Sequence, residues 1–214
     1  NVVCQSIADH CECGIRTELP RQTHMKLLSD VCADAQWLVR MVENLLSVTR
    51  VDAATVRLSK NGTVLEELID AVLVKFRKHY PDIDVHVEIP EEFVSIPMDA
   101  MLISQVLMNL LENAVFHAKG MENLRLRVEV KGSWAYFYVE DDGCGIPEEK
   151  LSRLFTGMLD SEAPTDQSRS SMGIGLSVCS AIIKAHGGEI WANKRAGGGT
   201  EVGFRLEMED ENGE

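Results

Sequence analysis

Apolar residues recur every seven positions from His24 to Asp52, which predicts one long helix. The apolar stripe of this helix is wider than a two-stranded coiled coil needs and suits a four-helix bundle. A single helix cannot complete a bundle, so it needs partners from outside the chain, most simply a second copy of the protein. The alternative is an ordinary helix that packs on its own domain.

A second helical pattern occupies the stretch from Asp99 to Lys119, with Asp99 as its predicted N-cap. Apolar residues at three- and four-residue spacing form one face, made of Leu102, Val106, Leu107, Leu110 and Ala114. On another face, Asn109, Glu112 and Asn113 follow the i, i+3, i+4 spacing, so their polar groups converge. Asparagine is a poor helix former, so Asn109 and Asn113 are either solvated surface amides or a functional feature.

The rest of the chain alternates between strand and helix patterns. We expect a strand at 55–58, a turn at 60–62, and a helix that runs from the capping box Thr63–Glu66 to just before Pro81. The inner face of this helix would consist of Leu65, Leu68, Ala71, Val72 and Phe76. The elements expected after it are strands at 85–89 and 93–96, a hairpin of 124–130 with 134–139, a short helix ending near Phe155, a loop at 156–171, a helix at 173–186, and strands at 190–193 and 202–206. This mixture predicts an α+β fold, a two-layer sandwich of one mixed sheet with helices on one face.

Composition narrows the classes of function. The net charge of −13 argues against a general nucleic-acid or anionic-membrane surface. The six cysteines include no CxxC pair, which is typical of a reduced, cytosolic protein. No apolar run reaches the roughly 18–20 residues that a membrane-spanning helix needs. We therefore expect a soluble piece, which could still belong to a longer membrane protein.

Two glycine pairs mark the second half of the chain, at 143–145 and 173–175. Neither has the third glycine of a dinucleotide fingerprint, and the chain contains no P-loop and no serine-hydrolase elbow. Asp141, at a strand end, can accept a hydrogen bond from an exocyclic amine. The second pair opens a helix whose free N–H groups suit phosphates, and the two asparagine amides suit Mg²⁺. Together these features predict one site for ATP and Mg²⁺.

In their order and spacing, these motifs resemble the ATP-binding domain of bacterial sensor histidine kinases, within the ATPase group that includes gyrase, Hsp90 and MutL. The matching segments are NLLEN (109–113) for the N box, DDGCG (141–145) for the first glycine box, Leu154-Phe155 for the F box, SMGIGLSVC (171–179) for the second glycine box, and GGGTEVGF (197–204) for the closing strand. NLLSVTRVD (44–52) resembles the second helix of the family's dimerisation and phosphotransfer bundle. The chain looks most like the KdpD-type kinases that control potassium uptake in two of its segments, WLVRMVENLLSVTRV and LLENAVFHAKG.

The resemblance implies a domain organisation and partners. Residues 23–53 would be the partial second bundle helix and 54–207 the ATP-binding catalytic domain. The residue pattern itself adds an unpatterned segment at 1–22 and an acidic tail at 208–214. It implies a homodimer through the 24–52 helix in the full-length protein and a response regulator as partner, of KdpE type if the narrower match holds. It also implies a cytoplasmic domain of a membrane-anchored bacterial protein that binds no nucleic acid.

The resemblance also implies roles for individual residues. Asp141 would hold the adenine amine, Asn113 would bind Mg²⁺, and Asn109 would orient the phosphates or the metal. The implied catalytic residues are Asn109, Glu112 and Asn113, and the implied metal ligands are Asn113 and Asn109. The implied nucleotide-binding residues are Asn109, Asn113, His117, Lys119, Asp141, Gly143, Gly145, Ile146, Phe155, Arg169, Gly173, Ile174, Gly175, Leu176 and Thr200. Thr200 would support Asp141, and 156–171 would form a lid over ATP.

Some positions depart from the family pattern. A Lys-Tyr pair often follows the N box, but Phe116 and His117 stand there, so Lys119 or Arg169 would have to supply the positive charge. Ser171 replaces the first glycine of the second glycine box.

The phosphoacceptor motif of the family, a histidine followed by an acidic residue with proline five positions on, is matched by neither His10 nor His24. We therefore expect a kinase core that binds Mg·ATP but does not phosphorylate itself. The alternatives are a nucleotide-binding pseudokinase and a gyrase-type ATP-hydrolysing clamp. The clamp would need an acidic residue as general base at position 109, where this chain has Asn109.

Overall fold

The computed structural model describes residues 25, 28, 31, 58–151, 154–155 and 172–208. The chain divides into two compact units, Asn1–Leu46 and Ser47–Glu214. In the first unit, Met25, Leu28 and Val31 are helical, and the rest of the helix predicted for 24–52 lies outside the described residues. Within the described residues, no helix combines the length and the apolar character that crossing a membrane requires.

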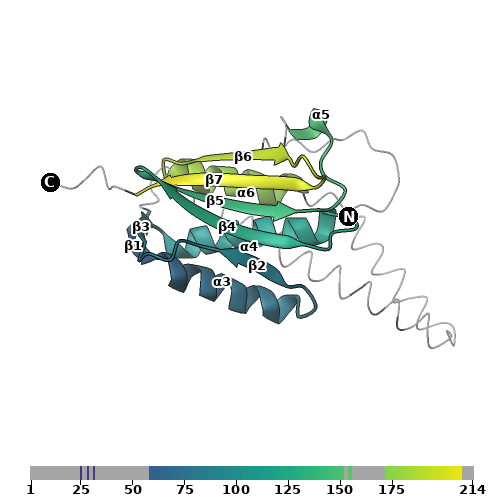
Figure 1. Cartoon of the computed structure of the whole chain (residues 1–214), viewed down its shortest axis with the longest axis horizontal. Coiled ribbons are helices and arrows are strands. Elements are labelled where there is room, and N and C mark those ends of the chain that lie inside the picture. Colours follow the sequence, from purple (N-terminus) through teal and green to yellow (C-terminus); the bar gives the residue numbers. More distant parts are fainter. Residues whose placement is uncertain are drawn as a thin grey trace. The chain divides into compact units, whose positions relative to one another are not determined.

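A five-stranded mixed sheet forms one layer of the second unit, in the order β2-β4-β5-β7-β6 (Figure 1). Its strands are β2 (Val85–Glu88), β4 (Leu124–Lys131), β5 (Trp134–Asp141), β6 (Glu189–Lys194) and β7 (Thr200–Glu207). β2 pairs in parallel with β4, and the other neighbours are antiparallel. The predicted mixed sheet and the predicted hairpin of β4 with β5 are therefore confirmed.

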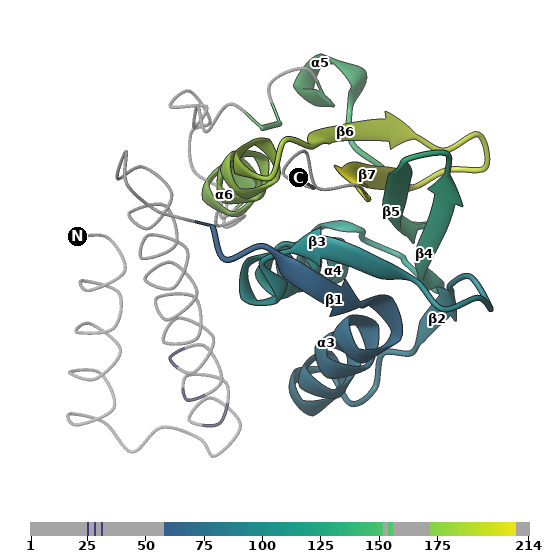
Figure 2. The same cartoon turned by 90° about the vertical axis from the view of Figure 1, so that its left-hand side faces the viewer.

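Side chains alternate between the two faces of the sheet, as the period of two requires. In β5, Phe137 and Val139 are buried on the helix side, where the Phe137 ring stacks on Phe204 of β7 with 4.6 Å between centroids. Tyr136 and Tyr138 lie on the opposite face, near the ring of Trp191 in β6. No element among the described residues covers that second face, which we call the outer face (Figure 2).

Three longer helices cover the inner face of the sheet: α3 (Leu65–His79), α4 (Ala100–His117) and α6 (Met172–Ala185) (Figure 2). A fourth, α5 (Glu148–Leu151), is a single turn. Asp99 caps α4 as predicted, because its Oδ1 accepts hydrogen bonds from the backbone N–H groups of Met101 (3.1 Å) and Leu102 (3.2 Å). The buried face of α4 is wider than predicted and also includes Ile103, Met108 and Leu111.

α4 and α6 pack side by side and run antiparallel. The backbone N–H of Asp99 donates to Nε2 of His186 (3.1 Å), and the Cys179 thiol donates to the carbonyl of Val106 (3.9 Å). These contacts lie seven residues apart on each helix, with the order reversed. Seven residues beyond Val106 along α4 is Asn113, and seven residues before Cys179 along α6 is Met172, the first residue of that helix. The start of α6 is therefore expected beside Asn113.

The structure corrects the prediction for residues 55–66. Two residues of the expected turn at 60–62 instead begin the strand β1 (Asn61–Val64), which pairs antiparallel with β3 (Ser95–Met98). The capping box Thr63–Glu66 is absent: Val64 occupies the N-cap without a side-chain cap, and the carbonyl of Val94 accepts the backbone N–H of Leu65 (3.0 Å). Of the strand expected at 55–58, residue 58 lies in no strand and the others lie outside the described residues.

Two smaller details also differ from the prediction. β3 begins two residues later than the expected strand at 93–96, and Phe93 is 80% exposed. Ala71 faces solvent, whereas Ile69 and Leu73 join the buried side of α3. Both differences are shifts within correctly placed elements, because the apolar pattern of a short element leaves its ends and its exact facing poorly determined.

Candidate functional site

Asp141 ends β5, with its side chain on the helix side of the sheet and only 7% of the residue exposed. Its Oδ1 accepts hydrogen bonds from the backbone N–H groups of Gly143 (3.0 Å) and Thr200 (3.3 Å). Burial raises the pKa of Asp141, and the two backbone hydrogen bonds oppose that rise. Both bonds engage Oδ1, so a ligand amine can approach Oδ2. The arrangement is that of a fixed, buried hydrogen-bond acceptor.

The turn after β5 packs against the end of α4. A Cβ on Gly143 would come within 2.6 Å of the Cβ of Ala118, so only glycine fits at that place. Gly145 adopts a left-handed conformation with φ of 71°, and the backbone N–H of Cys144 donates to the carbonyl of Lys119 (3.1 Å). The first glycine pair is therefore needed to bring this turn against the helix that carries the two asparagines.

On α4, Asn113 and His117 carry side-chain nitrogens that are available to a ligand. Nδ2 of Asn113 and Nε2 of His117 are buried and have no hydrogen-bond partner among the described residues. An unpaired buried polar group is costly, which favours a bound group that completes its hydrogen bonds. Burial lowers the pKa of His117, so its ring is neutral near pH 7 and offers a hydrogen bond without a positive charge.

Asn109 and Glu112 are engaged within the fold. The side chain of Asn109 hydrogen-bonds the thiol of Cys179 in α6. The hydroxyl of Tyr80, just after α3, donates to Oε1 of Glu112 (3.3 Å). These two contacts tie α4 to α6 on one side and to the end of α3 on the other.

The second glycine pair lies in the first turn of α6, as predicted, together with Ile174. Because α4 and α6 pack antiparallel, this turn is expected to lie beside Asn113, which would bring backbone N–H groups and a side-chain amide together. Leu176 is buried in the core, so its backbone and not its side chain could face a ligand. The arrangement suits an anion, and the amide oxygen of an asparagine is a ligand type that Mg²⁺ accepts.

The remaining predicted residues differ in position. Ile146 and Phe155 are partly buried against the core, and Lys119 is exposed. Arg169 and the predicted lid at 156–171 lie outside the described residues. Phe116 lies edge-on to the ring of Tyr80, with 6.1 Å between centroids. Within the described residues, no group of three or more His, Cys, Asp or Glu side chains is arranged to hold a metal ion.

Two residues beside the site were missed by the sequence analysis. Asp142 accepts hydrogen bonds from the backbone N–H groups of Glu122 (2.8 Å) and Asn123 (2.9 Å) and from the Asn123 amide, which lower the pKa of Asp142 to about 2. Arg195 donates from Nη1 to the backbone carbonyl of Asp141 (2.8 Å). The aspartate doublet at 141–142 could have indicated the first of these, but no local pattern marks Arg195.

A comparison with protein families matches residues 98–210 to the histidine kinase-, DNA gyrase B-, and HSP90-like ATPases. Among characterised proteins, the sensor protein KdpD of Clostridium acetobutylicum is 32% identical over 185 residues. The match covers 86% of this chain and 20% of KdpD, so the chain spans about a fifth of that relative's length.

Solved structures share the fold. The histidine kinase AdeS of Acinetobacter baumannii superposes with a TM-score of 0.72 at 22% identity, over 97% of this chain and 96% of AdeS. The histidine kinase ThkA, solved in complex with the response regulator protein TrrA, superposes with a TM-score of 0.73 at 23% identity, over 98% of this chain and 60% of ThkA. The arrangement of one mixed sheet with helices on its inner face is thus the one that these proteins have.

Proposed function

Since the chain belongs to the family of histidine kinase-, DNA gyrase B-, and HSP90-like ATPases, we propose that residues 54–207 are the catalytic domain of a sensor histidine kinase and bind Mg·ATP for phosphoryl transfer. The observation that carries the proposal is the buried carboxylate of Asp141, held by two backbone N–H groups. An acceptor fixed in this way selects a purine that presents an exocyclic amine. The similarity to KdpD supports a histidine kinase over the other members of the family.

The phosphates would lie between the start of α6 and the polar face of α4. Backbone N–H groups in the first turn of α6 can bind phosphate oxygens, and the unpaired groups of Asn113 and His117 can complete the hydrogen bonding. Asn113, with Asn109 beside it, would hold Mg²⁺, which when bound neutralises phosphate charge. Neutral amide ligands suit a chain whose net charge is already −13, because they add no further repulsion.

In the proposed reaction the γ-phosphoryl group passes from ATP to a histidine side chain, and ADP leaves. The work of the domain is to position the nucleotide and neutralise its charge. The accepting histidine would belong to another segment or another chain, since neither His10 nor His24 has the family's acceptor pattern. Residues 1–214 by themselves would therefore bind ATP without autophosphorylation.

The wider biology of the protein follows from the same relatives and is part of the proposal. A response regulator would receive the phosphoryl group, of KdpE type if the similarity to KdpD extends to function in potassium or osmotic signalling. The full-length protein would form a homodimer through the 24–52 helix. Its kinase core would work in the cytoplasm, attached to a membrane-anchored sensor.

The test is a titration with a fluorescent ATP analogue, with and without Mg²⁺, on the wild-type chain and on Asp141→Asn. We expect saturable wild-type binding that Mg²⁺ strengthens, and a loss of about tenfold or more in Asp141→Asn, because an amide presents a donor where the adenine amine needs an acceptor. Asp70→Asn, on the exposed side of α3, is the matched control and should bind like the wild type.

Two results would contradict the proposal. If Asp141→Asn binds ATP as tightly as the wild type, Asp141 is not the residue that holds the adenine amine. A wild-type chain that fails to bind ATP at any Mg²⁺ concentration would exclude an ATP-dependent kinase, and would equally exclude a pseudokinase that signals through bound nucleotide.

A further inference from the structure

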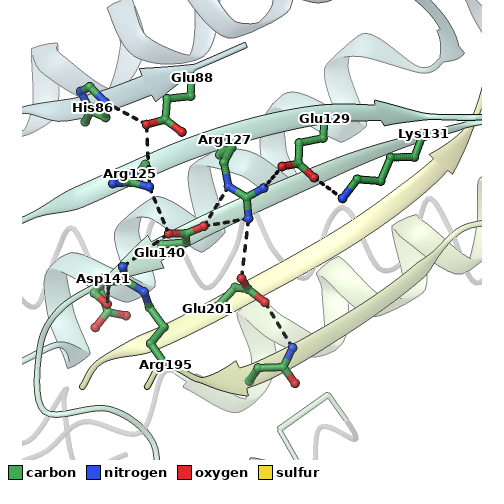
Figure 3. Close-up of polar contacts among 11 residues, drawn as sticks. His86, Glu88, Arg125, Arg127, Glu129, Lys131, Glu140, Asp141, Arg195 and Glu201 are labelled. Carbon is green, nitrogen blue, oxygen red and sulfur yellow. Dashed lines mark hydrogen bonds and ion pairs between the residues drawn. The ribbon is translucent and has the colours of Figure 1, made fainter. Parts of the chain in front are cut away.

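On the outer face of the sheet, three arginine side chains converge on the carboxylate of Glu140 (Figure 3). Arg127 contacts Oε1 through Nε (3.1 Å) and Nη2 (3.0 Å), while Arg125 and Arg195 approach Oε2 at 3.9 Å and 3.6 Å. The side chain of Glu140 is only 7% exposed. A carboxylate this buried requires charged partners, and the convergence of three of them fixes its position firmly.

Glu140 and Asp141 are consecutive residues at the end of β5, so their side chains lie on opposite faces of the sheet. Arg195 bridges them. Its Nη2 approaches the Glu140 carboxylate on the outer face, and its Nη1 donates to the backbone carbonyl of Asp141 at 2.8 Å. One guanidinium group therefore holds the side chain of one residue and the main chain of the next.

Arg195 also holds the turn between β6 and β7. Its backbone N–H donates to the carbonyl of Gly199 (3.3 Å), and its carbonyl accepts the backbone N–H of Gly198 (3.1 Å). The residue after this turn, Thr200, supplies the backbone N–H that contacts Oδ1 of Asp141. A side chain on Gly199, which has φ of 84°, would overlap the carbonyl oxygen of Asp141. The turn thus lies directly against the strand end that Arg195 holds.

We propose that Arg195 is a positioning residue for adenine recognition: it fixes the end of β5 and the β6–β7 turn so that the Asp141 carboxylate keeps its place. The proposal rests on the proposed function, because it assumes that Asp141 binds the adenine amine. The positive charge of Arg195 has a second effect on the same group. It favours the ionised carboxylate and so opposes the rise in the pKa of Asp141 that burial causes.

The experiment compares two nucleotides, ATP and purine riboside triphosphate, which lacks the exocyclic amine, on the whole chain between pH 5 and 8. We expect Arg195→Gln to weaken ATP binding about tenfold and to leave the binding of purine riboside triphosphate unchanged. The loss of ATP affinity at acid pH should begin at a higher pH in Arg195→Gln than in the wild type. Arg195→Lys keeps the charge and a single donor nitrogen in place of the guanidinium fork, so it should recover part of the ATP affinity.

The matched control is Arg205→Gln. Arg205 is likewise an arginine that reaches the outer face, but it belongs to β7, pairs with Glu189 (2.8 Å) and lies over the ring of Trp134 (4.4 Å), away from the Asp141 end of β5. We expect this variant to bind both nucleotides like the wild type. The combination of Arg195→Gln with Asp141→Asn should bind ATP no more weakly than Asp141→Asn alone, because Arg195 acts through Asp141.

The outcomes separate this inference from the proposed function. Wild-type binding of ATP with an unchanged Arg195→Gln variant would overturn the role of Arg195 and leave the ATP site intact. Equal losses for the two nucleotides, or additive losses in the double variant, would show a general structural role and overturn the inference as well. A wild-type chain that does not bind ATP would overturn the proposed function, and this inference with it.

Discussion

Cys144 and Cys179 show how differently the fold treats the same side chain. Cys144 is exposed between the two glycines of the turn after β5, and its thiol lies 3.5 Å from the carbonyl of His117 at the end of α4. Cys179 is buried inside α6, and burial raises the pKa of Cys179 to about 12. Because thiolates and not thiols react with alkylating agents, only the first of these should be reactive in the folded protein.

We therefore predict that iodoacetamide at pH 8 alkylates Cys144 in the folded chain and leaves Cys179 unmodified until the chain is denatured. Mg·ATP should slow the modification of Cys144, since this residue lies within the proposed site. Mass spectrometry of the peptides that contain each cysteine measures both rates. Modification of Cys179 in the folded chain as fast as that of Cys144 would contradict the burial of the Cys179 thiol in α6.

Local sequence patterns reveal some residues of the candidate site and not others. Asp141 and the turn that follows it could be predicted, because a strand end followed by two glycines has few structural explanations. Arg195 could not, because its contact with Asp141 joins residues 54 positions apart and arginine on a strand-end turn is common on any surface. The roles of all these residues remain predictions until binding is measured.

Among the larger elements, the antiparallel pair of α4 and α6 depends on a buried histidine. Nδ1 of His186 lies 2.8 Å from the carbonyl of Ile182, and Nε2 accepts the backbone N–H of Asp99. This arrangement requires the neutral ring, with its proton on Nδ1. Burial lowers the pKa of His186, and the nearby charge of Lys60 lowers it further, while the Ile182 carbonyl and Asp99 oppose the decrease.

These contacts predict an acid-dependent loss of stability. The unfolded chain binds a proton at the ordinary histidine pKa of 6.5, whereas folded His186 binds one only at lower pH. Stability from this residue is therefore complete above pH 6.5 and decreases as the pH falls from 6.5 through the lower pKa of the folded state. Urea unfolding between pH 5 and 8 measures the slope.

His186→Ala should reduce the free energy of unfolding near pH 7 by about 1–3 kcal/mol, because it leaves the N–H of Asp99 without its acceptor, and it should make the acid slope shallower. His86→Ala is the control, since His86 is exposed on β2 and should change little. An unaltered slope in His186→Ala would show that other groups cause the acid sensitivity.

The elements that the sequence predicted well are those with long, regular patterns. The helix capped by Asp99 and the hairpin of β4 with β5 fall into this group. β1 was missed because Lys60-Asn61-Gly62 has the local chemistry of a turn, whereas pairing with β3 determines its conformation. A four-residue strand is too short for its own pattern to outweigh such a long-range contact.

For the whole molecule, the described hydrophobic core lies within a single stretch of chain. Every buried apolar residue of the core cluster falls between Leu65 and Leu206, and the partly buried residues against it extend from Leu58 to Met208. A stretch with its own continuous core is expected to fold without the rest of the chain.

We predict that residues 54–208, produced alone, fold cooperatively and bind ATP with the affinity of the whole chain. Circular dichroism during thermal unfolding and the fluorescent-nucleotide titration measure the two properties. Residues 1–53 should in turn determine any concentration-dependent dimerisation in sedimentation experiments, because the seven-residue repeat lies there. Loss of folding or of ATP binding in the shorter fragment would show that residues 1–53 contribute to the folding or the nucleotide binding of the rest of the chain.

The opposite facing of Glu140 and Asp141 also constrains how this sequence can change over evolutionary time. Inserting or deleting one residue within β5 would turn the arginine-bound carboxylate of Glu140 inward and Asp141 outward. One such change would therefore remove both the arginine contacts on the outer face and the Asp141 acceptor on the inner face. Changes of length at the hairpin turn around Gly132 leave that alternation intact. Natural relatives should therefore differ in length at this turn. They should have no insertion or deletion between the turn and the two aspartates at 141–142.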